Sequence, residues 1–244
     1  MQLETPVMPF VRQLSRVGLR PDDRLVQRIV EHGAAARTAL LELATQTEAL
    51  HSEYPADLGP LHALRLLGEV PDPSIIVPLL AVLPVPVHGD DDVPAQLYVK
   101  EVLQIIGRVG EPAVPVLWAY ADDETHTAAA RTVAINTLTY VVTYAPAVRE
   151  AVLAEARRRL SLDLTVPMTT GVVALLAELG DTTSYQAVMA AYRAGRVDTD
   201  QAPAAAARQL LLGGGQPELT CVNHSFAERY AHHGPHLKTP TATT

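Results

Sequence analysis

The sequence of 244 residues contains little cysteine and few aromatic residues. Its single cysteine, Cys221, permits no disulfide within the chain, so we expect a reducing, cytoplasmic setting. Only 5% of the residues are aromatic, and alanine, leucine and valine supply most of the apolar content, which favours helices packed closely through small side chains. Hydrophobic residues nevertheless make up 48% of the chain, which excludes general disorder.

Positive charge is also scarce. Lys100 and Lys238 are the only lysines, and the formal net charge is −8. Because nucleic-acid binding needs clustered cations, this balance argues against DNA or RNA as a partner, and equally against an anionic membrane surface. The longest charge-free runs, Pro73–Gly89 and Thr132–Val148, are shorter than the ~20 apolar residues of a membrane-spanning helix. The sequence does not open with a basic segment followed by an apolar one, so we expect no signal peptide.

Known catalytic motifs are missing. The sequence has no GxSxG motif, P-loop or GxGxxG motif, so we expect neither enzymatic activity nor a cofactor. The acidic stretch HGDDD at His88–Asp92 lacks the alternating ligands and central glycine of a calcium loop, and we interpret it as a solvated loop. Zinc-ligand residue types occur near the end of the sequence without the spacing of a finger, so we predict no metal site at Cys221, His224, His232, His233 and His236.

What the sequence does contain is an internal repeat. Five junctions of similar pattern each follow a long segment of helical periodicity. Their anchor residues are His32, Val70, Val109, Tyr144 and Leu179, and the spacings between successive anchors are 38, 39, 35 and 35 residues. Each unit is predicted to be a helix, a tight turn and a second helix. Gly68 and Gly107 are predicted to end first helices in the left-handed conformation. No segment alternates with period two, so we expect essentially no sheet.

One stretch resembles a known family. Residues Pro112–Leu138, PAVPVLWAYADDETHTAAARTVAINTL, resemble the HEAT repeat in its PBS-lyase-like variant, common in bacteria, with the acidic turn at Asp122–Asp123 and the helix arginine at Arg131. The resemblance extends over about Pro21 to Leu212. It implies an all-α protein, a right-handed, armadillo-like α-solenoid of about five HEAT-like helical hairpins whose second helices line a concave face.

This resemblance also implies a division of the chain. We expect the solenoid to span residues 1–212, with an N-terminal cap over residues 1–19 and a last partial helix over residues 202–212. Gly213–Gly215 is expected to end the ordered part. Residues 213–244 are expected to form a flexible tail, with at most a short helix at Ser225–His232.

HEAT-like arrays mostly serve as binding scaffolds, which implies a non-catalytic adaptor, a monomer, that binds a protein partner through its concave face. Because Trp, Tyr and Arg are the usual interface anchors, the candidate partner-binding residues on the second helices are Trp118, Tyr120, Arg149, Arg157, Tyr185, Tyr192 and Arg193. For Trp118 the alternative is a place in the core between repeats, and for Tyr192 the two possibilities are balanced.

Other functions stay open. Bilin lyases share this repeat, so a bilin-lyase-like or other small-molecule role in the same groove is the alternative. A regulatory subunit that makes contact through the tail or through Arg12 and Arg16 is a third hypothesis. A di-iron hydroxylase of the HEAT type is set aside because no histidine precedes a glutamate. The scattered histidines are interpreted as ordinary surface or boundary residues: His32, His51, His62 and His126.

Overall fold

The computed structural model describes residues 6–89, 91–215 and 217–235, and over that range it contains helices and no β-strand, as the sequence predicts. The α-helices are α1 (Met8–Val11), α2 (Asp23–Val30), α3 (Ala34–Ala44), α4 (Gly59–Leu67), α5 (Ile76–Ala81), α6 (Val93–Gly107), α7 (Ala113–Asp122), α8 (Ala128–Tyr144), α9 (Arg149–Leu160), α10 (Val166–Glu178), α11 (Tyr185–Arg193), α12 (Ala204–Gly213) and α13 (Phe226–His233). The 3-10 helices are η1 (Arg12–Ser15), η2 (Thr47–His51), η3 (Ala56–Leu58), η4 (Pro73–Ile75), η5 (Pro146–Val148), η6 (Thr182–Ser184) and η7 (Pro217–Asn223). None of the described helices combines the length and apolar character needed to cross a membrane.

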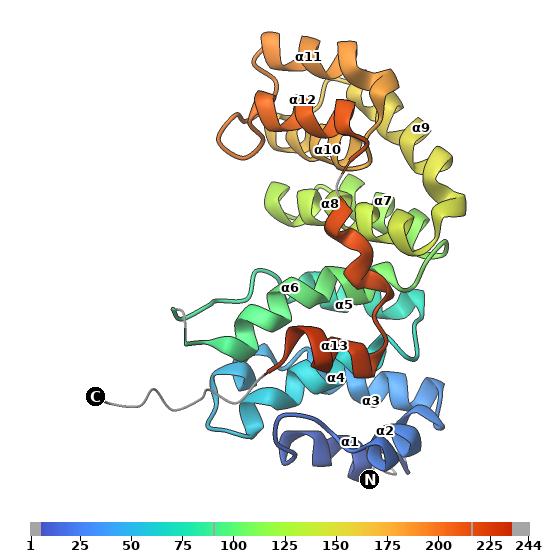
Figure 1. Ribbon diagram of the computed structural model, residues 1–244, viewed down its shortest axis with the longest axis vertical. Coiled ribbons are helices and arrows are strands. Elements are labelled where there is room, and N and C mark those ends of the chain that lie inside the picture. The colour runs from blue at the N-terminus through green and yellow to red at the C-terminus, as the bar shows by residue number, and fades with distance from the viewer. Residues whose placement is uncertain (1–5, 90, 216, 236–244) are drawn as a thin grey trace. The chain divides into compact units, whose positions relative to one another are not determined.

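The chain divides into two compact units. Unit 1 comprises Met1–Pro71, Pro84–Ile105 and His224–Thr244, and unit 2 comprises Asp72–Leu83 and Ile106–Asn223. Unit 1 is therefore assembled from three separate segments of the sequence, and the segment that carries α13 belongs with α1 to α4 (Figure 1).

Helix α4 forms the centre of unit 1. All nine of its residues are buried. Helix α3 packs along α4, and α13 lies against α4 although it comes from a distant part of the sequence (Figure 1). A helix that is buried all round is expected to be apolar, so the two polar members of α4, His62 and Arg65, require partners inside the unit.

Helices α8 and α10 form the centre of unit 2. Helix α8 packs against α7 and α10, and α10 also packs against α9 and α12. The helices α8, α10 and α12 thus form one layer, while α7, α9 and α11 each pack against a member of it (Figure 1). Gly171 on α10 permits the close approach of α8, because a Cβ atom there would lie 2.9 Å from Cγ2 of Thr132.

The predicted repeat junctions are confirmed. His32 lies between α2 and α3, Val70 between α4 and η4, and Val109 between α6 and α7, while Tyr144 ends α8 and Leu179 follows α10 directly. The turn after α4 also has the predicted start signal, because the Asp72 carboxylate accepts a hydrogen bond from the backbone N–H of Ser74 at 2.9 Å. The spacing of the pattern therefore located five helix–turn–helix units.

The prediction for the junction glycines is wrong. Gly68 has a φ of −64°, and the residue after α6 with positive φ is Gly110, at +72°, instead of Gly107. Gly107 is required for a different reason: a Cβ atom on it would lie 2.7 Å from Cβ of Tyr140. The glycine at the end of α6 therefore serves helix packing instead of a left-handed cap.

Helices are present at both expected ends of residues 1–212, whereas the glycine run after them does not end the ordered part as expected. The expected cap over residues 1–19 corresponds to α1 and η1, with residues 1–5 outside the described range, and the expected helix over residues 202–212 is α12. The glycine run packs closely: Gly214 ends α12 with a φ of +88°, and the N–H of Gly215 bonds to the carbonyl of Leu210 at 2.9 Å.

Residues 217–233 do not form the flexible tail that the sequence suggests. They contain η7 and α13, and Phe226 and Tyr230 of α13 are buried. The short helix expected at Ser225–His232 is present with nearly those bounds, and Ser225 and Glu228 form its capping box. The sequence missed the burial because the residues that cover this helix lie more than 100 positions away. Residues 236–244 of the expected tail lie outside the described residues.

Candidate functional site

Two of the seven predicted contact residues are buried in unit 2. The Trp118 side chain is 8% exposed, and the guanidinium carbon of Arg159 lies 4.3 Å from its ring centroid. Tyr120 is 5% exposed and stacks on His126, with ring centroids 3.9 Å apart. Trp118 is therefore buried, as in the alternative that places it in the core, and not exposed for contact with a partner. Both aromatic residues hold α7 within the unit.

The two predicted arginines on α9 also have partners inside unit 2. Arg157 makes a bidentate pair with Asp181, with N···O distances of 2.9 and 2.7 Å, and a further hydrogen bond to Glu150 at 2.8 Å. Asp181 is buried, and the Arg157 guanidinium holds the pKa of that carboxyl below its usual value. Arg149 donates to the backbone carbonyl of Leu179. Both arginines therefore join α9 to the turn that follows α10.

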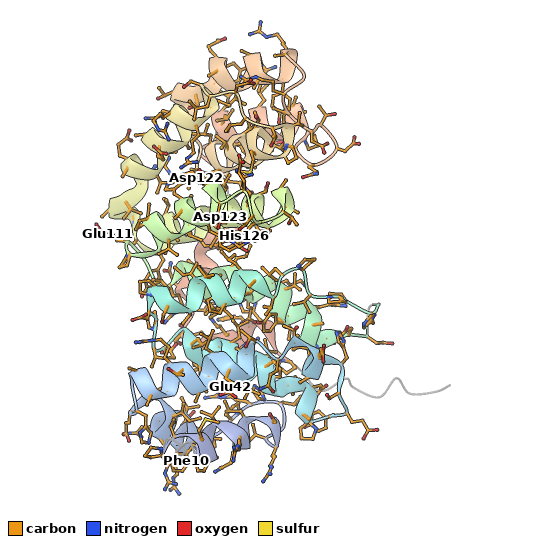
Figure 2. All side chains as sticks on the ribbon, turned by 180° about the vertical axis from the view of Figure 1, so that it is seen from behind. Phe10, Glu42, Glu111, Asp122, Asp123 and His126 are labelled. Atoms are coloured by element: carbon orange, nitrogen blue, oxygen red, sulfur yellow. The ribbon has the colours of Figure 1, made fainter. Side chains whose placement is uncertain are left out.

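An ion pair that the sequence analysis missed joins α9 to the end of α7. The Arg159 guanidinium donates to both carboxylate oxygens of Asp122, one of them at 2.8 Å. This contact holds the pKa of the Asp122 carboxyl below its usual value. Asp122, Asp123 and His126 mark the turn between α7 and α8 (Figure 2). Helix α9 is thus tied by charge to the helix pair before it and to the one after it.

The remaining predicted residues lie on α11. The Tyr192 hydroxyl donates to the Ala202 carbonyl at 2.8 Å, so this side chain fastens the loop after α11. Tyr185 is half-buried, and Arg193 is exposed with its Nε donating to the Met189 carbonyl at 3.3 Å. Of the seven predicted contact residues, Tyr185 and Arg193 are thus the best placed for a contact with another molecule.

A second candidate site lies in unit 1, where α13 packs on polar side chains of α4, of the turn that follows α4, and of α6. We define the docking surface as the residues of this region that bind α13 or its flanks: His62, Arg65, Glu69, Glu101 and Gln104. The sequence analysis missed it. The available signal was the presence of His62 and Arg65 within an otherwise apolar helical segment.

Charge is buried at the docking surface. Arg65 and Glu101 are at most 1% exposed and form a bidentate pair, with Nε of Arg65 2.9 Å from Oε2 of Glu101. Arg229 of α13 is also 1% exposed, donates to the amide oxygen of Gln104 at 2.9 Å and lies 3.6 Å from Glu101. One carboxylate therefore faces two guanidinium groups, and every member is engaged.

His62 fixes the other end of the contact. Its Nε2 lies 3.0 Å from the Gly18 carbonyl, which can only accept, so Nε2 carries the proton and Nδ1 accepts from the Tyr230 hydroxyl. Burial lowers the pKa of His62 to about 4, so the ring is neutral at pH 7. The prediction that His62 is an ordinary surface or boundary residue is wrong, since it is fully buried.

Backbone groups complete the docking of α13. The N–H of Phe226 donates to the Glu69 carboxylate at 2.9 Å, and Arg65 donates to the Gly234 carbonyl. The Arg65 guanidinium also lies over the Tyr230 ring, 4.2 Å from its centroid. Both ends of α13 are therefore held, and the arrangement is suited to recognition of a helix.

The structure brings together three of the histidines weighed as zinc ligands. His224 Nδ1 and His233 Nε2 are 3.1 Å apart, and the His232 ring stacks on His224 at a centroid distance of 4.9 Å. Among residues 6–89, 91–215 and 217–235, no group of three histidine, cysteine, aspartate or glutamate side chains is placed to hold a metal ion. His236 lies outside that range.

The HGDDD stretch contributes to a small cavity in unit 1. His51 Nδ1 lies 3.2 Å from Asp92, and the rings of His51 and His88 are 4.5 Å apart. These side chains line a cavity of about 380 Å³ together with Asp57, whose pKa is raised by burial. The residues that line the cavity come from η2, η3, the start of α6 and the loop that precedes α6.

Comparison of this chain with protein-family models, with curated proteins and with solved structures finds no match in any of the three. The resemblance to HEAT repeats therefore stays a prediction from the sequence.

Proposed function

We propose that the protein is a non-catalytic scaffold, built as a HEAT-like solenoid, that binds a protein partner through the face formed by its second helices. The observation that carries this proposal is the helix–turn–helix unit that recurs at five junctions 35 to 39 residues apart. An array of this kind buries its core between neighbouring pairs and leaves one helix of each pair to face outward along a continuous surface.

The ion pairs of α9 support rigid display. Arg159 joins α9 to Asp122 at the end of α7, and Arg157 joins it to Asp181 ahead of α11. Helix α9 is thereby linked to the end of α7 and to the turn between α10 and α11 by bidentate contacts of fixed geometry. A surface whose helices are already fixed loses less conformational entropy on binding, which favours its use as a docking platform.

The proposed contact surface is centred on α11. Tyr185 and Arg193 are the predicted residues that reach solvent there, while Trp118, Tyr120, Arg149, Arg157 and Tyr192 support the helices from within. The half-buried Tyr185 and the exposed Arg193 are of the residue types that most often anchor protein interfaces.

The test begins with affinity purification of the tagged protein from its own host, followed by reconstitution with the purified partner and measurement of Kd. We expect a stoichiometric protein partner whose affinity falls about 10-fold or more in the Tyr185→Ala/Arg193→Ala double variant. Arg208→Ala is the matched control, because Arg208 is an exposed arginine on α12 in the other layer. An equal affinity of the double variant and the control would reject the α11 surface. Recovery of the protein without a partner but with a bound chromophore would favour the small-molecule alternative.

A further inference from the structure

We propose that the docking surface on α4 and α6 is a binding site for a helix of another protein, one with an aromatic residue followed by Arg and Tyr three and four positions later. In this structure the chain's own α13, with Phe226, Arg229 and Tyr230 at that spacing, fills the site. The inference concerns unit 1 and does not depend on the partner proposed for α11 of unit 2.

The first argument is the polarity of what α13 covers. The docking surface consists of His62, Arg65, Glu69, Glu101 and Gln104. When α13 leaves, these polar groups gain water, which offsets part of the cost of exposing the apolar side chains Phe226 and Tyr230 and the surface they cover. The surface can therefore exist both covered and uncovered, as an exchangeable site requires.

The second argument is the length of the covering helix. Helix α13 has eight residues, too few to be stable alone in water, so its order depends on the contacts at the docking surface. Short elements held by such contacts open locally without unfolding of the remaining structure. A competing helix can therefore bind to the docking surface during the intervals in which α13 has opened.

The third argument is charge complementarity, which defines the partner. Without α13 the docking surface carries Arg65 against Glu69 and Glu101, an excess of one negative charge, and Arg229 supplies the missing positive charge. A helix with a lysine or a neutral residue at this position would lose the planar donor that faces Gln104 and Glu101. The partner helix therefore needs an arginine to supply the missing positive charge. It also needs a tyrosine whose hydroxyl donates to Nδ1 of His62.

The test uses the full chain and a fluorescent peptide with the sequence of residues 224–235, HSFAERYAHHGP. In the wild-type protein the attached α13 competes at high effective concentration, so the peptide binds weakly. In the Arg229→Ala protein the attached helix competes poorly, and we expect the same peptide to bind at least ~10-fold more tightly. A peptide that itself carries Arg229→Ala is expected to bind to neither protein, and Arg208→Ala serves as the control that keeps wild-type affinity.

Hydrogen exchange of the wild-type protein covers the case in which Arg229→Ala fails to fold. We expect the amides of α13 to exchange at least ~10-fold faster than those of α4 and α10, because opening of α13 is local. Equal protection of α13 and α4 would show a permanent core element and overturn the proposal. So would a folded Arg229→Ala protein that binds the peptide no better than wild type. A concentration-dependent dimer that Arg229→Ala abolishes would identify a second copy of the chain as the occupant, and would overturn the proposal of a different partner.

Discussion

The neutral state of His62 follows from its surroundings. The ring has a carbonyl acceptor at one nitrogen and a hydroxyl donor at the other, and it is fully buried beside Arg65. Protonation would place a second positive charge next to the guanidinium and would turn the acceptor Nδ1 into a donor. The tyrosine is suited to this place because burial raises the pKa of Tyr230, so that its hydroxyl keeps the proton it donates.

Removal of the Tyr230 hydroxyl tests this hydrogen bond. Tyr230→Phe leaves Nδ1 of His62 buried without a donor, and we expect the free energy of unfolding to fall by about 1–3 kcal/mol. Tyr185→Phe is the control, since among the described residues that hydroxyl has no hydrogen-bond partner, and we expect a loss of less than ~0.5 kcal/mol. Urea denaturation measures both; similar values for the two variants would show that the hydrogen bond between Tyr230 and His62 does not stabilise the fold.

The low pKa of His62 predicts a pH dependence with a definite sign. Unfolding returns the pKa of His62 from about 4 toward the ordinary histidine value of 6.5, so the unfolded chain binds more protons between these values. Stability is therefore expected to fall as the pH drops from 6.5 to 4, with up to about 3 kcal/mol from this group. Comparison with His62→Gln over the same pH range isolates that contribution, because other groups titrate in both proteins; parallel curves would contradict the prediction.

Helix α9 has ion pairs to the elements on both sides of it in the chain. Its last turn carries Arg157, Arg158 and Arg159, and each has a different role: Arg157 reaches Asp181, Arg159 reaches Asp122, and Arg158 pairs with Glu155 on the same helix. The sequence places all three at the negative end of the helix dipole. The sequence alone does not show which arginine has which role. The partner carboxylates, Asp181 of Arg157 and Asp122 of Arg159, lie 24 and 37 residues away.

Substitution of these arginines is expected to have unequal effects. Arg157→Ala leaves the buried Asp181 carboxylate without its cation, and we expect a loss of about 2 kcal/mol. Arg158→Ala removes an exposed pair on one helix, with the arginine side chain 57% exposed, and we expect less than ~0.5 kcal/mol. Thermal or urea unfolding of both variants provides the measurement, and equal losses would show that the Arg157–Asp181 pair does not tie the helices together.

The glycine run after α12 allows a second comparison at this scale. Gly180 and Gly195 both have positive φ, +65° and +68°. A Cβ atom on Gly180 would lie 2.4 Å from the backbone carbon of Gly214, whereas nothing lies within 4 Å of one on Gly195. Gly195→Ala is expected to cost about 1 kcal/mol for the left-handed backbone, and Gly180→Ala clearly more. If urea unfolding gives equal costs, the backbone contact between the α10–η6 turn and the glycine run is not tight.

The whole molecule shows which features a local pattern can reveal. The five junctions were found from the sequence because helical periodicity and turn residues recur at nearly constant spacing. The docking of α13 was not found, because His62 and Tyr230 meet across 168 positions of sequence with no repeat to signal it. Trp118 and Tyr120 were expected at an interface, yet the helix that carries them is apolar on most of its surface and is buried accordingly.

The distribution of charge over the molecule predicts weak interaction with nucleic acid. The net charge is −8, and several of the arginines, including Arg65, Arg157, Arg159 and Arg229, are already engaged with carboxylates. We expect no shift of a duplex DNA band at low salt, where counterion release favours binding most. A complex that weakens steeply as salt is added would show a cationic surface that this charge balance does not predict.

The composition of unit 1 from three segments has a consequence for synthesis on the ribosome. Residues 106–223 of unit 2 are synthesised before residues 224–235, although those residues are the cover of α4. Because domains tend to fold in the order in which they emerge, unit 2 can complete its core while unit 1 still waits for α13. During that interval Arg65, Glu101 and His62 remain hydrated in the nascent chain. Their polarity reduces the apolar share of the surface that unit 1 exposes before Phe226 and Tyr230 are added.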